Sequence, residues 1–273
     1  MNGGSPTREI VITSTRNVRV QSVRRLTKRG VRDERREFLI EGALGVEQAL
    51  RTTASVKSLM VCSQEDCTEL VRLARSKGIP VAEVSDAVMR SISSATTPPG
   101  VLAISKFVDR DPVALLRGQL DLVVVLAGVR DPGNAGTIIR SAAAVGADAV
   151  FSGGTTVDLY NPKVVRATAG ALFSVPVSRD VDVPWLLSEL GARNVSTVAA
   201  DPEGPTIYYD ADLKQPTALV LGNEAWGVAR EVVESVDSTV CIPMKHGVES
   251  LNVGMAASVV LFEVARQRRT DGA

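Results

Sequence analysis

Two short apolar runs near the end of the chain, residues 218–221 and 239–242, limit the folds that it can adopt. Each run has the length of a buried strand and is bounded by turn residues. The first run is followed at once by Gly222, and the second by Pro243 and a polar loop. Small residues at strand ends leave backbone N–H and C=O groups free for a ligand, which suits a flat heterocycle bound without charged side chains. The alternative interpretation is an ordinary α/β edge with two tight turns.

The second half of the chain predicts an α/β domain built on a mostly parallel sheet with helices on both faces. Residues 122–126 form an unbroken aliphatic run that is typical of a central parallel strand. Helices are expected at 137–145 and 254–265, and either Asn252 or Ser250 could cap the second of these.

The first part of the chain predicts a smaller α/β unit. Short strands alternate with helices from residue 37 to residue 105, and a polar stretch follows them. We therefore expect a domain at 1–106, a linker at 107–119 and a larger domain at 120–273.

Length and composition are those of a globular protein without a membrane span. The 273 residues are 45% hydrophobic and 23% charged, and no apolar run approaches the roughly 18 residues that cross a bilayer. The N-terminus lacks the apolar core of a secretion signal, so we expect a cytoplasmic protein. There are three cysteines, an odd number, and the only histidine is His246, so neither a disulfide framework nor a metal site is expected.

Positive charge is concentrated near the start of the chain, although the whole sequence balances 31 basic against 31 acidic residues. Residues 16–36 contain nine basic and two acidic side chains. Val18, Val20, Val23 and Leu26 recur beneath them at helical spacing, which predicts an amphipathic helix. This segment either docks a polyanion or is a solvated helix face.

A polar pattern follows the aliphatic run at 122–126. Asn134, Gly136 and Arg140 fit neither the dinucleotide-binding spacing G-x-G-x-x-G nor a phosphate-binding loop with its lysine. On a helix, Asn134 and Arg140 lie about a third of a turn apart. Arg140 is therefore either a surface cation or a clamp for a phosphodiester, whose geometry suits the planar guanidinium.

Three motifs in this order resemble those of the SpoU family, the TrmH-like RNA ribose 2′-O-methyltransferases of the SPOUT class. They are Asn134-x-Gly136-x3-Arg140, then Leu221-Gly222-Asn223-Glu224-x2-Gly227, then Ile242-Pro243-Met244 followed by Glu249-Ser250-Leu251-Asn252-Val253. The first 100 residues also resemble the family's N-terminal substrate-binding domain, with a basic helix followed by Arg35-Arg36-x-Phe38-Leu39-Ile40-Glu41-Gly42. The resemblance covers nearly the whole chain and is to ribosomal RNA methyltransferases, antibiotic-resistance members among them.

The resemblance implies a fold, an assembly and a cofactor. The family passes its C-terminal segment through a loop to form a deep trefoil knot, works as a homodimer, and binds S-adenosylmethionine mainly through backbone groups. Carried over to this chain, the cofactor-binding positions are Ala200, Leu221, Gly222, Gly227, Ile242, Met244 and Leu251. No metal is required, because the sulfonium supplies the leaving group.

The resemblance also implies five catalytic positions: Arg140, Ser250, Asn134, Glu224 and Asn252. Arg140 matches the family's proposed base, helped by Ser250 and an RNA phosphate. Because an arginine guanidinium stays protonated in proteins, our hypothesis is that Arg140 positions the phosphate while a phosphate oxygen or Ser250 relays the proton. The third motif commonly reads Asn-Val-Ser, and Gly254 in this chain lacks that hydroxyl.

The expected substrate is RNA, and large-subunit ribosomal RNA is favoured because the N-terminal half forms a separate globular domain. Phosphate contacts are expected from Arg24, Arg25, Lys28, Arg29, Arg32 and Arg36. The alternatives are a tRNA ribose methyltransferase, a methyltransferase for a base nitrogen, and a non-catalytic RNA-binding protein on the same fold. The motifs do not distinguish a housekeeping methylation from one that confers antibiotic resistance.

Overall fold

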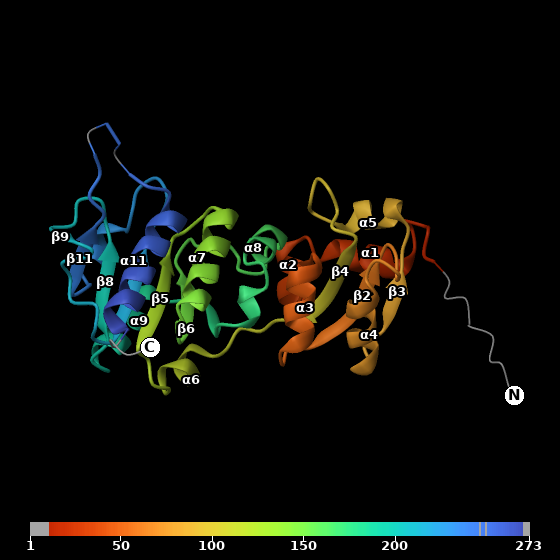
Figure 1. Ribbon diagram of the computed structural model, residues 1–273, viewed down its shortest axis with the longest axis horizontal. Coiled ribbons are helices and arrows are strands. Elements are labelled where there is room, and N and C mark those ends of the chain that lie inside the picture. The colour runs from red at the N-terminus through yellow and green to blue at the C-terminus, as the bar shows by residue number, and fades with distance from the viewer. Residues whose placement is uncertain (1–10, 246, 249, 270–273) are drawn as a thin grey trace, which may run out of the picture. The chain divides into compact units, whose positions relative to one another are not determined.

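The computed structural model describes residues 11–245, 247–248 and 250–269, which fold into two compact units that divide between Phe107 and Val108. His246 and Glu249 lie outside the described residues. No helix in the described ranges combines the length and the apolar character needed to cross a membrane. Figure 1 shows the elements of each unit with the labels used below.

The first unit is built on a mixed four-stranded sheet with the order β1-β4-β2-β3. Its strands are β1 (Glu37–Glu41), β2 (Val56–Val61), β3 (Val81–Glu83) and β4 (Val101–Lys106), and its helices are α1 (Val18–Arg25), α2 (Arg29–Arg35), α3 (Ala43–Arg51), α4 (Thr68–Ser76) and α5 (Asp86–Ile92). Strand β4 runs antiparallel to both β1 and β2, whereas β2 and β3 are parallel. The prediction of a small α/β unit is confirmed.

The basic segment folds as two helices rather than one. Val20, Val23 and Leu26 are buried in a core that also contains residues of α5, as the amphipathic pattern predicts, but Val18 is exposed. Helix α1 ends at Arg25, and α2 follows almost at once, with Lys28 at its N-cap and Arg29 as its first residue.

The second unit is built on a seven-stranded sheet in which every strand pairing is parallel, as predicted. Its strands are β5 (Leu122–Ala127), β6 (Ala149–Gly153), β7 (Val177–Val181), β8 (Ser196–Ala200), β9 (Thr206–Ile207), β10 (Thr217–Leu221) and β11 (Ser238–Cys241). Its helices are α6 (Pro112–Leu116), α7 (Pro132–Ala144), α8 (Pro162–Ala167), the 3-10 helix η1 (Ala171–Phe173), α9 (Val183–Gly191), α10 (Arg230–Val233) and α11 (Val253–Arg268). The strand order is β7-β6-β5-β10-β8-β11-β9, so β10 enters the sheet between β5 and β8.

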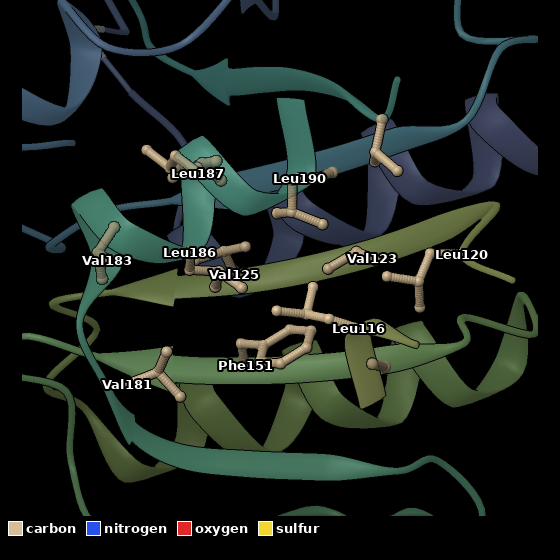
Figure 2. Packing of buried hydrophobic residues seen from close by; sticks show 14 of the residues in the cluster. Leu116, Leu120, Val123, Val125, Phe151, Val181, Val183, Leu186, Leu187 and Leu190 are labelled. Carbon is tan, nitrogen blue, oxygen red and sulfur yellow. The ribbon is translucent and has the colours of Figure 1, made fainter. Parts of the chain in front are cut away.

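Helices cover both faces of this sheet (Figure 1). On one face, α6 and α9 pack on side chains that alternate along the strands, among them Val123 and Val125 of β5 (Figure 2). Helices α7 and α11 lie side by side on the opposite face, where the Ser141 and Ser258 hydroxyl oxygens are 2.7 Å apart. Because both faces of the sheet are covered, the interior strand β5 is an unbroken aliphatic run.

Four helices of the second unit begin with an Asp or Asn cap and a proline in the first turn. The caps are Asp111 of α6, Asp131 of α7, Asn161 of α8 and Asp182 of α9, and each side chain accepts a hydrogen bond from a backbone N–H of the first turn. Proline is favourable there because its missing N–H would have no helical partner. Helix α7 therefore begins at Pro132 rather than at the predicted position 137. Residues 107–119, predicted as a linker, contain α6, whose Leu116 is buried in the core of the second unit.

The fully buried side chain of Tyr160 holds the first residues of the second unit. Its hydroxyl oxygen accepts hydrogen bonds from the backbone N–H groups of Val108 (2.8 Å) and Asp109 (2.7 Å) and donates one to the Asp109 carboxylate (2.7 Å). Burial, and then the adjacent Asp109 charge, raise the pKa of Tyr160, so the hydroxyl keeps the proton that it donates. One oxygen atom therefore satisfies three polar groups of the incoming chain.

We expect Tyr160→Phe to destabilise the protein by about 1–3 kcal/mol, because it leaves two part-buried backbone N–H groups without an acceptor. Urea unfolding followed by circular dichroism measures the change. Tyr209→Phe, at a tyrosine that is 48% exposed, is the matched control and should change little. Equal unfolding midpoints for the Tyr160 variant and the native protein would contradict the anchoring role of the hydroxyl.

Candidate functional site

Three neighbouring parallel strands end at one cavity of about 650 Å³. Strands β10, β8 and β11 lie next to one another in the sheet, and Ala200, Gly222 and Ile242, at or just after their carboxyl ends, line the cavity. In parallel α/β sheets, ligand sites form at this edge, outside the carboxyl ends of the strands. The volume lies within the range of small-molecule sites, about 300–1,000 Å³.

A tight loop after β10 forms one wall of this cavity. The backbone N–H of Asn223 donates to the Gly227 carbonyl (2.7 Å), and the N–H of Gly227 donates to the Asn223 carbonyl (2.9 Å), which closes the loop. The Asn223 side-chain oxygen accepts two N–H groups of the loop, including that of Trp226, and its amide nitrogen donates to the Gly128 carbonyl (3.1 Å). A Cβ on Gly222 would lie 2.2 Å from the Gly227 carbonyl oxygen, so only glycine fits at that position.

The three sequence motifs meet in a chain of hydrogen bonds beside the cavity, which we call the amide–carboxylate network. The Asn252 amide nitrogen donates to the Asn134 side-chain oxygen (2.8 Å), and the Asn134 amide nitrogen donates to the Glu224 carboxylate (3.0 Å). Glu224 also accepts from the backbone N–H groups of Asp131 (2.8 Å) and Arg130 (3.1 Å). The network therefore ties the start of α7, the loop after β10 and the residue before α11 to one another.

The charge of Glu224 determines the direction of this network. Partial burial opposes ionisation, but the hydrogen bonds from Asn134, Asp131 and Arg130 outweigh it and hold the pKa of Glu224 below its usual value. The ionised carboxylate can only accept, so Asn134 presents its nitrogen to Glu224 and its oxygen to Asn252. The Asn252 oxygen then accepts the N–H of Gly254 and caps α11.

The wall of the cavity is acidic. Asp201, Glu203 and Glu224 line it together with apolar residues such as Val240, and no lysine or arginine is among the lining residues in the described ranges. Such a lining favours a ligand that combines positive charge with an apolar or flat part.

Most of the predicted cofactor-binding residues line the cavity, namely Ala200, Gly222, Gly227, Ile242, Met244 and Leu251, and so do Ser250 and Glu224 of the predicted catalytic set. Leu221 is different, because its side chain is fully buried at the end of β10 and is not among the residues that line the cavity. Asn134 and Asn252 belong to the amide–carboxylate network rather than to the cavity wall. Arg140 is exposed on α7 and is not among the lining residues.

Five of the six predicted phosphate-contacting cations are exposed on the first unit: Arg24, Arg25, Lys28, Arg29 and Arg36. Arg32 is only 3% exposed, and its guanidinium donates to the carbonyl oxygens of Leu26 (2.9 Å) and Thr27 (2.8 Å). The prediction that Arg32 contacts phosphate was wrong, because this side chain ties the end of α1 to α2. Charge spacing alone does not show which cation turns inward to satisfy carbonyl groups at a helix end.

Several residues of the site were not predicted. Asp131 caps α7 and binds Glu224 through its N–H, Asn223 locks the loop after β10, and Asp201 and Glu203 add charge to the cavity. The pair Asp131-Pro132 is a helix-start signal that could have located the first of these. The hydrogen bond from Asn223 to the Gly128 carbonyl joins segments 95 residues apart, and Asp201 and Glu203 follow a different strand from Asn223, so no local pattern marks them as parts of one site.

Comparison with known proteins covers both units of the chain. Residues 121–262 match the SpoU rRNA Methylase family, and residues 17–103 match the MRM3-like substrate binding domain. The 23S rRNA (uridine(2479)-2′-O)-methyltransferase of Streptomyces viridochromogenes is 33% identical, over 93% of this chain and 92% of that protein. The 23S rRNA (guanosine(2553)-2′-O)-methyltransferase RlmP of Bacillus subtilis is 31% identical, over 93% of this chain and 98% of its own.

Solved structures of similar proteins also superimpose on nearly the whole chain. An rRNA methyltransferase from Sinorhizobium meliloti with bound AdoMet, which is S-adenosylmethionine, has a TM-score of 0.84 at 31% identity and covers 96% of this chain and 99% of its own. The SpoU methyltransferase AviRb from Streptomyces viridochromogenes, in complex with the same cofactor, has a TM-score of 0.82 at 30% identity and covers 93% and 98%.

We expect Glu224→Gln to lower the free energy of unfolding at neutral pH by about 1–3 kcal/mol, because an amide nitrogen would face N–H groups that now donate to the carboxylate. The pKa of Glu224 is depressed in the folded protein, so its contribution is fully present above the unfolded value of about 4.5 and is lost as pH falls through the lower folded value. The difference between the native protein and the variant should therefore shrink in acid.

Urea unfolding at neutral pH and in acid measures this difference. The control is Glu231→Gln, at an exposed glutamate of α10. A difference between native and Glu224→Gln proteins that stays constant across the pH range would mean that the carboxylate charge does not organise the network.

Proposed function

The chain belongs to the SpoU rRNA methylase family and is an S-adenosylmethionine-dependent RNA 2′-O-methyltransferase, and on this premise we propose that its substrate is large-subunit ribosomal RNA. The observation that carries the proposal is the length of this chain over which its relatives align. Relatives named as 23S rRNA methyltransferases align over 93% of this chain, so they have counterparts of both units.

The tRNA alternative has weaker support. A solved structure described as giving insight into 2-OH methylation of C/U34 on tRNA covers 58% of this chain but 97% of its own, with a TM-score of 0.50. That chain therefore lacks a counterpart for much of this one. The match of residues 17–103 to a substrate-binding domain favours an additional RNA-selecting unit, as the ribosomal proposal requires.

The cavity at the ends of β8, β10 and β11 is the proposed site of the methyl donor. When bound, S-adenosylmethionine supplies an electrophilic methyl group on a sulfonium. Backbone groups around Gly222, Ile242 and Leu251 would hold its flat and apolar parts, as the small residues and the volume of the cavity allow. Asp201 and Glu203 complement its positive charge.

The amide–carboxylate network acts by position in this proposal. Glu224 orients Asn134, Asn134 orients Asn252, and Asn252 caps the helix that follows the loop at 242–252. Residues 242–244, 250 and 251 of that loop line the cavity, so the network would keep this part of the loop in the shape that receives the donor. The trefoil knot expected from the resemblance belongs to the same proposal, because it would tie this loop to the segment after β10.

The proposed active assembly is a homodimer in which Arg140 serves the partner's cavity. Arg140 is exposed and does not line the cavity of its own chain. Helix α11, beside α7, carries two exposed apolar side chains, Met255 (59%) and Phe262 (56%), whose spacing of seven places them on one helix face. An apolar helix face in this position fits a second copy of the chain.

The reaction requires that a ribose hydroxyl, a weak nucleophile, loses its proton as it attacks the methyl carbon. Arg140 would hold the phosphate next to that ribose through paired hydrogen bonds from its planar guanidinium. The proton would be relayed to solvent by a phosphate oxygen or by the hydroxyl of Ser250, which is exposed at the cavity. The exposed cations of α1 and α2 in the first unit would hold more distant phosphates of the same RNA.

The substrate is tested with labelled S-adenosylmethionine and either transcribed large-subunit rRNA fragments or tRNA, followed by mapping of the modified nucleotide. We expect 2′-O-methyl label in ribosomal RNA and none in tRNA. Label confined to tRNA, or found on a base nitrogen, would overturn the proposal. Donor binding without transfer to any RNA would favour the non-catalytic alternative.

We expect Arg140→Ala to leave the affinity for S-adenosylmethionine unchanged and to slow methyl transfer by about 100-fold, because the group that positions the phosphate is lost. Arg140→Lys keeps the charge but not the planar geometry, so it should recover only part of the rate. Calorimetry gives the affinity and initial rates give the transfer. Near-native transfer by an Arg140→Ala protein that still binds RNA would remove Arg140 from the mechanism.

Subunit mixing shows whether Arg140 acts across the dimer. Gly222→Ala is expected to block the cavity of its own chain, because the added Cβ meets the Gly227 backbone. In a heterodimer of the two variants, the Arg140→Ala chain keeps an intact cavity and the Gly222→Ala chain keeps an intact Arg140. These two intact parts complete one site only if Arg140 acts on the partner's cavity. Activity that returns on mixing supports this arrangement, and a mixture as inactive as its parents contradicts it.

A further inference from the structure

Trp226 is the most exposed aromatic side chain in the described part of the chain, at 80%, and it lies on the wall of the proposed donor cavity. Single exposed apolar residues are common on protein surfaces, so exposure alone carries no function. Neither the amide–carboxylate network nor the core uses this indole.

The backbone that carries Trp226 is fixed on both sides. Its own N–H donates to the Asn223 side chain (3.3 Å), and the next residue, Gly227, closes the loop by two backbone hydrogen bonds with Asn223. Two residues earlier, Glu224 is bound to Asn134 and to two backbone N–H groups. A large aromatic ring is thus presented to solvent from a loop that is already ordered, so binding to it requires little further loss of entropy.

The charges around the loop distinguish two sides of the cavity. Asp201, after β8, and Glu203 line the cavity wall and repel phosphate. Arg130, after β5, lies on the other side of β10; its N–H is bound to Glu224, and its exposed guanidinium is 3.4 Å from the Thr155 hydroxyl. On this side the Glu224 carboxylate is also charged, but it accepts three N–H groups that offset its charge, so an RNA strand that approaches the cavity is favoured on the side of Arg130, next to the loop of Trp226.

We propose that Trp226 stacks on a nucleobase of the RNA, at or beside the methylated nucleotide, and so selects nucleotides whose base is free to stack. This inference rests on the proposed function. The accepting oxygen is on C2′ and the base is on the adjacent C1′, so a base comes to the rim of the cavity whenever the hydroxyl reaches the donor. Aromatic side chains bind single-stranded RNA bases by stacking, largely without regard to sequence.

The test compares Trp226→Ala and Trp226→Phe with the native protein on a transcribed large-subunit rRNA fragment. We expect Trp226→Ala to raise KM for the RNA about tenfold, which corresponds to roughly 1.4 kcal/mol, while the Kd for S-adenosylmethionine stays unchanged. Trp226→Phe keeps a smaller ring and should fall between the two. Because the native side chain is exposed, both variants should fold normally, which circular dichroism checks.

Fluorescence gives a second measurement. The chain has two tryptophans. The other is Trp185 of α9, which is partly buried against the hydrophobic core of the second unit. In a Trp185→Phe background, the RNA fragment should therefore change the emission of Trp226 directly, and S-adenosylmethionine alone should change it much less.

The outcomes separate this inference from the proposed function. An unchanged KM for RNA in Trp226→Ala overturns the inference while the native enzyme still methylates ribosomal RNA. A loss of donor affinity with RNA binding intact, or dissociation of a dimer, also overturns it and assigns the indole to the cofactor or to the partner chain. A native protein that binds the donor but modifies no RNA refutes the proposed function itself, and the stacking inference with it.

Discussion

The Glu224 carboxylate accepts the hydrogen bonds that join the loop after β10 to the start of α7, and the rest of the arrangement depends on that one-way chemistry. Two amides follow it in series, and each can be turned either way in isolation. Because Glu224 accepts from Asn134, the Asn134 oxygen must face Asn252, and the Asn252 oxygen is then free to cap α11. The N-cap of a helix that starts 29 residues later thus depends on one ionised side chain on the loop after β10.

The net charge of the chain is zero, but acidic and basic side chains gather on different parts of it. Carboxylates line the cavity, exposed cations lie on α1 and α2 of the first unit, and Arg140 is exposed on α7. A cationic methyl donor and an anionic RNA need opposite surroundings, so one uniformly charged surface could not serve both.

Strands and helix caps could be predicted from the sequence where residues of a single element determine them. The aliphatic run at 122–126 forms β5, an interior strand of the parallel sheet, and Asn252, one of two residues considered, caps α11. Helix α7 starts five residues before the predicted position because Asp131 caps it and Pro132 opens it. Arg32 was misassigned because its partners are carbonyl groups at a helix end, and sequence spacing shows which side chains are charged but not which backbone groups need them. The links between motifs join loops about 90 to 118 residues apart, so only the fold reveals them.

The departure of the third motif at Gly254 has a steric explanation that leaves the site intact. A Cβ at this position would lie 3.2 Å from the Thr137 side chain and 3.1 Å from the Asn252 oxygen, closer than such contacts normally come. Glycine lets the first turn of α11 approach α7, and the Asn252–Asn134 hydrogen bond across that contact is 2.8 Å. Glycine at 254 therefore lacks a hydroxyl but allows close packing against Thr137. The amide–carboxylate network, rather than a hydroxyl at 254, connects the third motif to the first.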